Sequence, residues 1–311
     1  MTRSLRFLSM SLLLVVAACA RGQGATGSFD RTLKVGEPLE LEVQTGSGAI
    51  EVRAGAVGNV EVHGEIRVGS WRGLFGGGSR ASADDIVQNI KASPPIEQNG
   101  NRVVVGRLDE AFWHQNVSIS YTIVVPVATQ VRARSGSGSQ SVNGITGPVV
   151  VETGSGSTEL TDIGGAAEAR TGSGSIRARG IGGAFTGSTG SGQIEVVQTA
   201  RGDVAASTGS GSVEIRGVDG AARVRTGSGS VTIDGKPTGS WDLDTGSGSV
   251  HARMPPDAAF TIDARAGSGG VKTSQPITVS GNIERGTLQG QVRGGGPTVR
   301  IRTGSGGITL D

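Results

Sequence analysis

The sequence is poor in the residue types that hold together many compact exported domains. It has a single cysteine, Cys19, so no disulfide can form within the chain. Only 3% of its residues are aromatic, too few for a wide core filled by Phe and Trp. It has only 10 prolines, and its glycines do not recur at every third position, which excludes a collagen triple helix. A core must therefore be thin and built from Val, Ile, Leu and Ala.

The chain also lacks an excess of one charge. Its 29 basic and 27 acidic residues nearly balance, and Arg3 and Arg6 lie in a segment that we expect to be removed. A protein that binds nucleic acid through phosphates needs a basic surplus on one face. We therefore expect no nucleic-acid partner.

Residue patterns typical of catalysis or metal binding are sparse as well. The three histidines, His63, His114 and His251, are far apart in the sequence. The glycine-rich phrases are not followed by the helix or the Lys of a phosphate loop, and they lack the Asp that calcium-binding β-rolls repeat. We therefore expect no catalytic, metal-binding or cofactor-binding residues, and no enzyme activity.

The first 18 residues have the features of a bacterial export signal. Arg3 and Arg6 precede an apolar run, Phe7 to Ala18, that is shorter than the roughly 20 residues of a membrane-spanning helix. The segment Val16-Ala17-Ala18-Cys19 resembles the lipobox of bacterial lipoproteins, which implies cleavage before Cys19 and lipidation of its thiol. Residues 1–18 are therefore predicted to be a lipoprotein signal peptide. The alternative is an ordinary secretory leader.

Lipidation of Cys19 would make the membrane a partner of this protein. Several acyl chains on one cysteine give durable anchoring. Residues 19–28 are small and flexible and lack apolar anchors, which predicts a flexible tether. Ala20 after the cysteine, by resemblance to lipoprotein sorting in bacteria with two membranes, implies the outer membrane. The expected location is the cell envelope.

Glycine, by contrast, is abundant, with 55 copies, and many of them belong to a repeated phrase. Between Ser135 and Thr245 the phrase recurs every 18 or 19 residues, which indicates a solenoid or an array. The phrase is Thr-Gly-Ser-Gly or a close variant, and it begins at Thr45, Ser135, Thr153, Thr171, Thr189, Thr208, Thr226, Thr245, Ala266 and Thr303.

Apolar residues alternate with other residues on both sides of each phrase, and this alternation predicts strands. Val149 and Val151 precede one phrase, for example, and Ile176 and Ala178 follow another. Turn residues such as Gly164-Gly165 lie between successive strand pairs. We predict an all-β fold in which residues 135–311 form a parallel β-solenoid of about 18 residues per coil, with two short strands in each coil.

Residues 29–134 follow the pattern less closely and are predicted to hold strands and a cap. One clear copy of the repeat surrounds Thr45, and strands are expected again at 102–105 and 117–125. The segment 82–85 resembles a capping box, which predicts a short helix near 83–92. We expect this region to cover the first coil and prevent end-to-end addition of strands. The alternative is a recognition patch for a glycan or a protein partner, formed by Trp71, Phe75, Phe112 and Trp113.

The repeated phrases from Ser135 to Ser249 and the ending Gly294 to Gly306 resemble the bacterial putative-adhesin family of unknown function, and the head-GIN putative adhesins share the style. The resemblance implies a β-solenoid and supplies no catalytic or binding residues. Together with the leader, it favours a lipid-anchored envelope protein whose rigid surface binds an envelope glycan or a protein. The alternatives are a structural envelope component, a β-helical polysaccharide-cleaving enzyme and an ice-binding protein.

Overall fold

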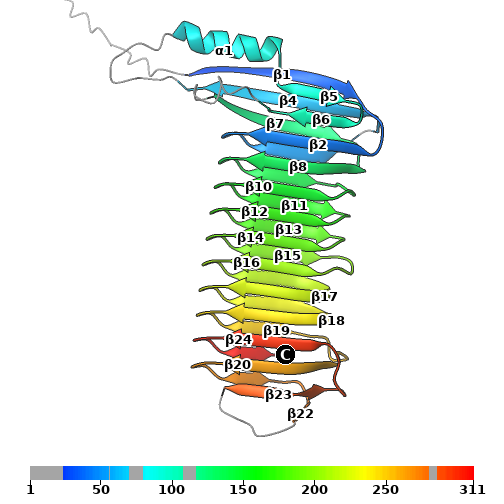
Figure 1. Ribbon diagram of the computed structural model, residues 1–311, viewed down its shortest axis with the longest axis vertical. Helices are drawn as coiled ribbons and strands as arrows, with labels where there is room; N and C mark the ends of the chain where they lie inside the picture. Colours follow the sequence, from blue (N-terminus) through cyan, green and yellow to red (C-terminus); the bar gives the residue numbers. More distant parts are fainter. Residues whose placement is uncertain (1–23, 56, 70–79, 108–116, 280–285) are drawn as a thin grey trace, which may run out of the picture.

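The computed structural model describes residues 24–55, 57–69, 80–107, 117–279 and 286–311. These residues form an elongated rod of stacked strands with a single helix at one end (Figure 1). The rod has two long faces that meet at the Thr-Gly-Ser-Gly phrases, and we call this edge the phrase corner. The all-β prediction with one short helix is confirmed for the described residues.

The first face is the pre-corner sheet, whose parallel strands end at the phrase corner. Successive strands β8, β10, β12, β14 and β16 pair in parallel without a shift of register, so that Val131, Val149 and Ala167 form one column. The pairing places residues 18 or 19 positions apart next to each other. The bounds are β2 (Leu39–Thr45), β6 (Arg102–Val105), β8 (Thr129–Ser135), β10 (Val149–Thr153), β12 (Ala167–Thr171), β14 (Phe185–Thr189), β16 (Val204–Thr208), β20 (Phe260–Ala266) and β24 (Thr298–Thr303).

The second face is the post-corner sheet, whose strands begin just after the phrase corner. β17 (Val213–Thr226) and β18 (Val231–Thr245) run without a break from this sheet into the pre-corner sheet of the next coil, which joins the two faces. The remaining bounds are β3 (Ile50–Ala54), β7 (Val117–Val125), β9 (Gln140–Asn143), β11 (Thr158–Ile163), β13 (Ile176–Ile181), β15 (Ile194–Gln198), β19 (Val250–Arg253), β21 (Val271–Thr273) and β25 (Ile308–Leu310).

The core is a thin layer between the two faces. Alternate residues of each strand point inward, so buried Val, Ile, Leu and Ala form columns along the rod. Two of the largest buried side chains are accommodated in different ways. The ring of Phe185 fills the space beside Gly187, which has no side chain. The Nε1–H of Trp241 donates a hydrogen bond to the Gly220 carbonyl at 3.1 Å. The core therefore has the composition that the sequence predicts, a thin layer of Val, Ile, Leu and Ala with few aromatic side chains.

The order of coils at the N-terminal end differs from the order in the sequence. β2 and β3 pair on one side with β6 and β7 and on the other side with β8 and β9. The repeat around Thr45 is therefore an internal coil, and the stack begins before residue 135, the boundary predicted from the sequence. The described strands between β3 and β8 in the sequence, together with residues 25–34, build the end of the rod beyond this coil (Figure 1).

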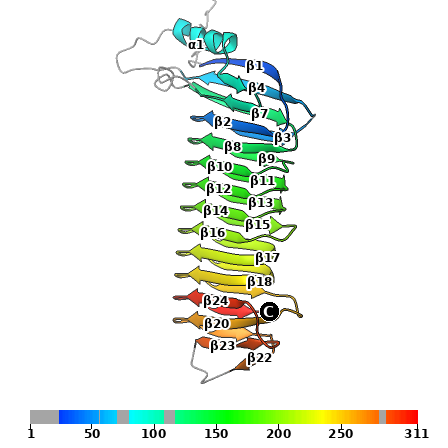
Figure 2. The same ribbon diagram turned by 45° about the vertical axis from the view of Figure 1, so that its right-hand side comes forward.

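Antiparallel strands and the helix close this end. β1 (Ala25–Lys34) pairs with β4 (Asn59–Val68), β4 pairs with β7, and β5 (Ile96–Asn99) pairs with β6. α1 (Arg80–Ala92) packs Val87 and Ile90 against this end, and a Cβ atom at Gly27 of β1 would meet the Val87 side chain at 2.5 Å. The helix lies over β1 and covers this end of the rod, as Figures 1 and 2 show.

Two boundaries predicted for this region need correction. The helix begins at Arg80, two residues before the expected capping box at Ser82, and its buried residues Val87 and Ile90 lie in its second half. The tether predicted for 19–28 is also too long. β1 begins at Ala25 and is held by the full length of β4, so residues 25–28 belong to the folded body.

The last coils of the sequence are also stacked out of order. β24 and β25 pair with β18 and β19, and β20 and β21 lie beyond them. The repeat near Thr303 is therefore inserted between two repeats that precede it in the sequence. β23 (Thr287–Val292) pairs antiparallel with β20, and β22 (Ile277–Val279) pairs with β23 at this end of the rod.

Candidate functional site

The phrase corner is held by the hydroxyl group of its first residue. Thr189 is buried, and its Oγ1 accepts a hydrogen bond from the Gly192 amide at 3.1 Å. The same hydroxyl donates to the Gly174 carbonyl of the neighbouring coil at 2.8 Å. The hydroxyl thus closes its own turn and joins two coils, which explains why the phrase recurs once per coil.

Equivalent threonines repeat this arrangement along the rod. Each donates to a Gly carbonyl of the adjacent coil at 2.7–3.2 Å and accepts from the Gly three residues later at 3.0–3.1 Å. They are Thr153, Thr171, Thr189, Thr208, Thr226, Thr245 and Thr303. Because these hydroxyls are buried and bonded internally, they do not form the exposed threonine face that an ice-binding protein requires.

The outward column beside this corner carries charged groups that pair between coils. Glu152 lies between two arginines of neighbouring strands: its carboxylate is 2.9 Å from Arg134 Nε and 3.6 Å from Arg170 Nη1. Arg170 Nη2 also lies 2.6 Å from the carboxylate of Glu168. The arginine side chains are 43% and 57% exposed and the Glu152 side chain is 33% exposed, so the group lies at the surface but is fixed by ion pairs.

A groove of about 790 Å³ runs along this column, over β2, β8, β10 and β12. Its wall is made by Gln44, Arg134, Glu152 and Arg170, which are directly adjacent in the strand register. Its floor is the backbone of the phrase corners, including Gly46, Gly136, Gly154 and Gly172. Gly106 and Val117 also line the groove.

The groove ends near a second charged group on the same face. Glu42 accepts hydrogen bonds from Arg102 Nη2 at 2.9 Å and from Gln44 Nε2 at 2.7 Å. Burial raises the pKa of Glu42, but these hydrogen bonds outweigh the effect and leave the pKa below its usual value. Glu42 therefore remains charged and orients Gln44 in the wall of the groove.

The opposite face carries its own ion pairs. Glu195 is held by Arg179 Nη2 at 2.9 Å and by Arg177 Nε at 3.1 Å. The hydrogen bond from Arg179, with a smaller one from Arg177, lowers the pKa of Glu195 although its partial burial acts in the other direction. These contacts link β13 to β15 and leave the Glu195 carboxylate engaged with the protein itself.

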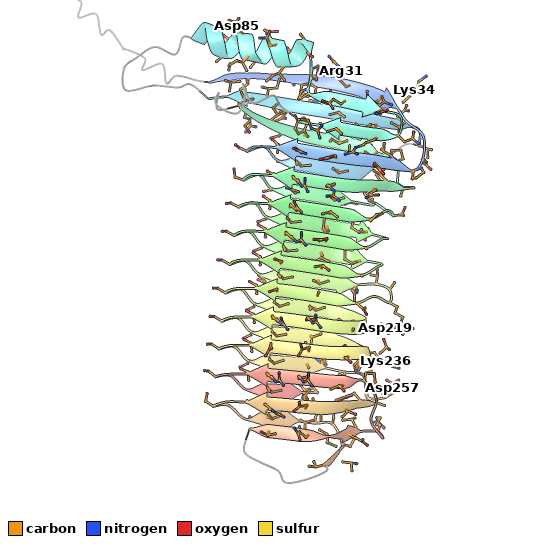
Figure 3. All side chains as sticks on the ribbon, in the orientation of Figure 1. Arg31, Lys34, Asp85, Asp219, Lys236 and Asp257 are labelled. Carbon is orange, nitrogen blue, oxygen red and sulfur yellow. The ribbon has the colours of Figure 1, made fainter. Side chains whose placement is uncertain are left out.

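The edge opposite the phrase corner also has stacked charges. Figure 3 shows Asp219, Lys236 and Asp257 one after another along this edge of the rod. Lys236 Nζ lies 3.0 Å from Asp257 Oδ2, and the hydrogen bond from Lys236 holds the pKa of Asp257 below its usual value. Thr238 Oγ1 donates to Asp219 Oδ1 at 2.8 Å. These contacts join successive coils rather than surround a hollow.

The described histidines lie at opposite ends of the rod. His63 of β4 is 2.7 Å from Asp30, and His251 of β19 is 3.3 Å from Asp311. Among the residues that the structure describes, no three His, Cys, Asp or Glu side chains are grouped closely enough to hold a metal ion. Within the same residues, no helix has the length and apolar character needed to cross a membrane.

The residues singled out in the sequence as sites cannot be placed. Cys19, Trp71, Phe75, Phe112 and Trp113 all lie outside the described residues, so lipidation and the aromatic recognition patch stay predictions. The groove was missed at the sequence level, because Arg134, Glu152 and Arg170 were not read as one column. Their constant position, one residue before the phrase, is the signal that identifies them.

Comparison with protein families gives one match that covers most of the chain. The family described as Toastrack DUF4097 matches residues 40–311. This range contains the whole stack of coils and begins within β2. No curated protein matches the chain.

Several solved structures resemble the chain at low sequence identity. A putative lipid binding protein from Parabacteroides distasonis has a TM-score of 0.49 at 14% identity, covering 92% of this chain and 98% of its own. A putative adhesin from Bacteroides fragilis has a TM-score of 0.37 at 12% identity, with 93% and 99% covered. A putative cell adhesion protein from Clostridium sporogenes has a TM-score of 0.26 at 11% identity, with 92% and 99% covered.

Proposed function

The chain belongs to the Toastrack DUF4097 family, and from this premise we propose that it is a non-enzymatic, lipid-anchored protein of the cell envelope. Its rod presents a rigid surface that binds an envelope glycan or a protein. The proposed location is the outer membrane, with Cys19 as the site of the anchor.

The observation that carries this proposal is the position of β1 at one end of the rod. Cys19 precedes the first residue of β1, Ala25, by only six positions. Five intervening residues span at most about 18 Å even when fully extended. An anchor at Cys19 would therefore hold the end covered by α1 close to the membrane and direct the other end away from it.

The length of the rod makes this orientation useful. Ten strand spacings separate β6 from β20 in the pre-corner sheet. At about 4.8 Å each, they correspond to roughly 48 Å. A surface on the long faces would thus be displayed beyond the lipid headgroups, where a polymer or a protein of the envelope can reach it.

The charged side chains of the rod form ion pairs with one another, and this supports a binding protein that catalyses no reaction. Glu152, Glu195 and Asp257 are each engaged by basic side chains, and His63 and His251 pair with carboxylates at separate ends. A general acid or base must be available to a substrate. These groups are instead ion-paired across strands, an arrangement in which a carboxylate such as Glu152 can accept a hydrogen bond from a ligand while its charge is held by its basic partners.

The experiment combines mass spectrometry of the native protein with protease treatment of intact cells. We expect a lipid-modified N-terminal Cys19 in the membrane fraction, and release of the protein into the soluble fraction when Cys19→Ser is introduced. Cleavage of the rod on intact cells would place it outside the cell, and protection would place it in the periplasm. A wild-type protein that is unmodified and soluble would overturn the anchoring.

Attachment itself is tested by deletion of the gene. We expect the deletion strain to adhere less well or to have a less intact envelope than the wild type, and the Cys19→Ser variant to fail to restore either property. A deletion strain that is unchanged in both respects would overturn the binding role.

A further inference from the structure

The groove beside the phrase corner has a wall of long polar side chains over a floor of glycine. The wall residues Gln44, Arg134, Glu152 and Arg170 come from four adjacent strands. They cover three strand spacings, or about 14 Å. The same column has only Ser188 and Ser207 in the next two coils. Beyond these two coils the column continues with Arg225, Asp244, Arg302 and Arg265, so the two serines separate the groove from a second group of charged side chains.

The polar groups of the wall are held in place before any ligand arrives. Arg134 uses its Nε on Glu152, and its two terminal nitrogens donate no hydrogen bond within the part of the chain that the structure describes. Arg170 is fixed by Glu152 and Glu168, and Gln44 by Glu42. An arginine side chain has five N–H donors in a rigid plane. The wall therefore offers several oriented donors next to carboxylate acceptors.

The wall residues Arg134, Glu152 and Arg170 sum to one positive charge, and Glu168, which pairs with Arg170 beside the groove, brings the ion-paired group to zero. Arg134 and Arg170 are balanced by Glu152 and Glu168, all within one group of contacts. A polyanion would need uncompensated basic groups. A peptide that adds a strand would need a free sheet edge, whereas this groove lies over a sheet face whose strands are already paired. Neither class of polymer fits the wall.

An uncharged glycan does fit these features. Each sugar ring carries neighbouring hydroxyls that donate and accept hydrogen bonds, which matches a planar guanidinium beside a carboxylate. The exposed glycine corners allow a ring to approach the backbone closely, since Gly136, Gly154 and Gly172 have no side chain in the way. A repeating ligand also matches a wall that repeats at the strand spacing.

We propose that this groove binds an extended, uncharged glycan strand that lies along the column of Gln44, Arg134, Glu152 and Arg170. The inference rests on the proposed binding function and assigns its ligand class and site. The guanidinium groups donate to sugar hydroxyls, and Glu152 accepts from them while holding both arginines in position.

The test measures binding by the purified mature protein in a calorimeter. The probes are the uncharged hexasaccharides cellohexaose, mannohexaose and N-acetylated chitohexaose, the neutral polysaccharide fraction of the producing cells, and the acidic hexagalacturonate. The double variant Arg134→Ala/Arg170→Ala removes the donors. Arg225→Ala/Arg302→Ala is the matched control, because these arginines occupy the same column in coils outside the groove.

We expect at least one neutral probe to bind, with a Kd raised about tenfold or more in the groove variant and nearly unchanged in the control. Far-UV circular dichroism and thermal unfolding of both variants verify that they fold. Binding that both variants retain, or that the control loses equally, would overturn the site. Binding of hexagalacturonate alone, or of none of the probes, would overturn the ligand class. These binding measurements are independent of the adhesion and anchoring experiments in cells. Failure of this inference is therefore distinct from failure of the proposed function.

Discussion

The hydroxyl of Thr189 offers a direct test of how the coils are held together. Thr189→Val keeps the shape of the side chain but removes the donor to the Gly174 carbonyl and the acceptor for the Gly192 amide. Two hydrogen bonds contribute about 1 kcal/mol each, and leaving a buried amide without a partner costs a further 1–3 kcal/mol, with some overlap between the terms. We expect the variant to lose roughly 2–4 kcal/mol of local stability.

Local stability is measured by hydrogen exchange with mass spectrometry, because a stack of repeats need not unfold in one step. A loss of 2–4 kcal/mol corresponds to exchange that is faster by about 30-fold to several hundred-fold. The acceleration should be confined to peptides from β12 to β15 and spare the coil formed by β2 and β3. Thr189→Ser, which keeps the hydroxyl, should change stability by less than about 1 kcal/mol, as Ser135 fills the equivalent position in the native chain.

Thr186→Val is the matched control, since Thr186 lies on the same strand but faces outward. A surface substitution of this kind changes stability by no more than about 0.5 kcal/mol. If Thr189→Val and Thr186→Val accelerate exchange equally, the threonine ladder does not stabilise the stack, and the account of the repeated phrase is wrong.

Three further predictions follow from other contacts. Gly192→Ala should destabilise the stack by several kcal/mol in chemical denaturation, since a Cβ would overlap the Gly174 carbonyl, whereas Gly46→Ala, with open space around it, should change stability by no more than about 0.5 kcal/mol. The pKa of Glu195 is lowered in the folded protein, so the Glu195 carboxylate should stabilise the fold above its unfolded pKa near 4.5, and this stabilisation should be lost as the pH falls through the folded pKa. A carboxyl NMR titration should find the lowered pKa, and Glu195→Gln should reduce the loss of stability in acid. The cysteine pair Asp242→Cys/Arg300→Cys should form a disulfide, because β18 and β24 are adjacent, whereas the pair Asp242→Cys/Asp263→Cys should not. The two variants are compared on a non-reducing gel, and the reverse result would show that the coils follow the order of the sequence.

The period and the strands could be predicted because one local rule generates them. Each coil needs an apolar alternation and a corner residue with a hydroxyl, so Thr171 or Thr226 marks its corner without reference to the rest of the chain. The helix was predicted from a local capping signal and occurs close to the expected place. The place of the helix on the end strands, with Val87 and Ile90 buried, depends on contacts with β1 and β4 that are distant in sequence and so gave no local signal.

The order of the coils could not be predicted from the period, because similar repeats are interchangeable neighbours. Two residues carry the missing information. Ala266 has no hydroxyl and so cannot continue the threonine ladder, which Thr303 does by donating to the Gly248 carbonyl at 2.7 Å. Arg300 is adjacent to both Asp242 and Asp263 in the register, whereas stacking β20 directly on β18 would have placed those two aspartates side by side. Like charges directly opposite each other destabilise a sheet.

The reversed order at both ends also explains how the rod avoids growing or fraying. The first repeat of the sequence lies between β6–β7 and β8–β9, and the last lies between β18–β19 and β20–β21. Both of these coils therefore have a neighbour on each side, and opening either of them breaks two interfaces instead of one. The outermost parallel strands β6, β7 and β20 come from inside the sequence and pair with the antiparallel strands β5, β4 and β23, and β1 pairs in turn with β4. Parallel stacking stops at these strands, because a further coil would meet a strand that runs in the opposite direction, and such a strand opposes end-to-end addition of another rod.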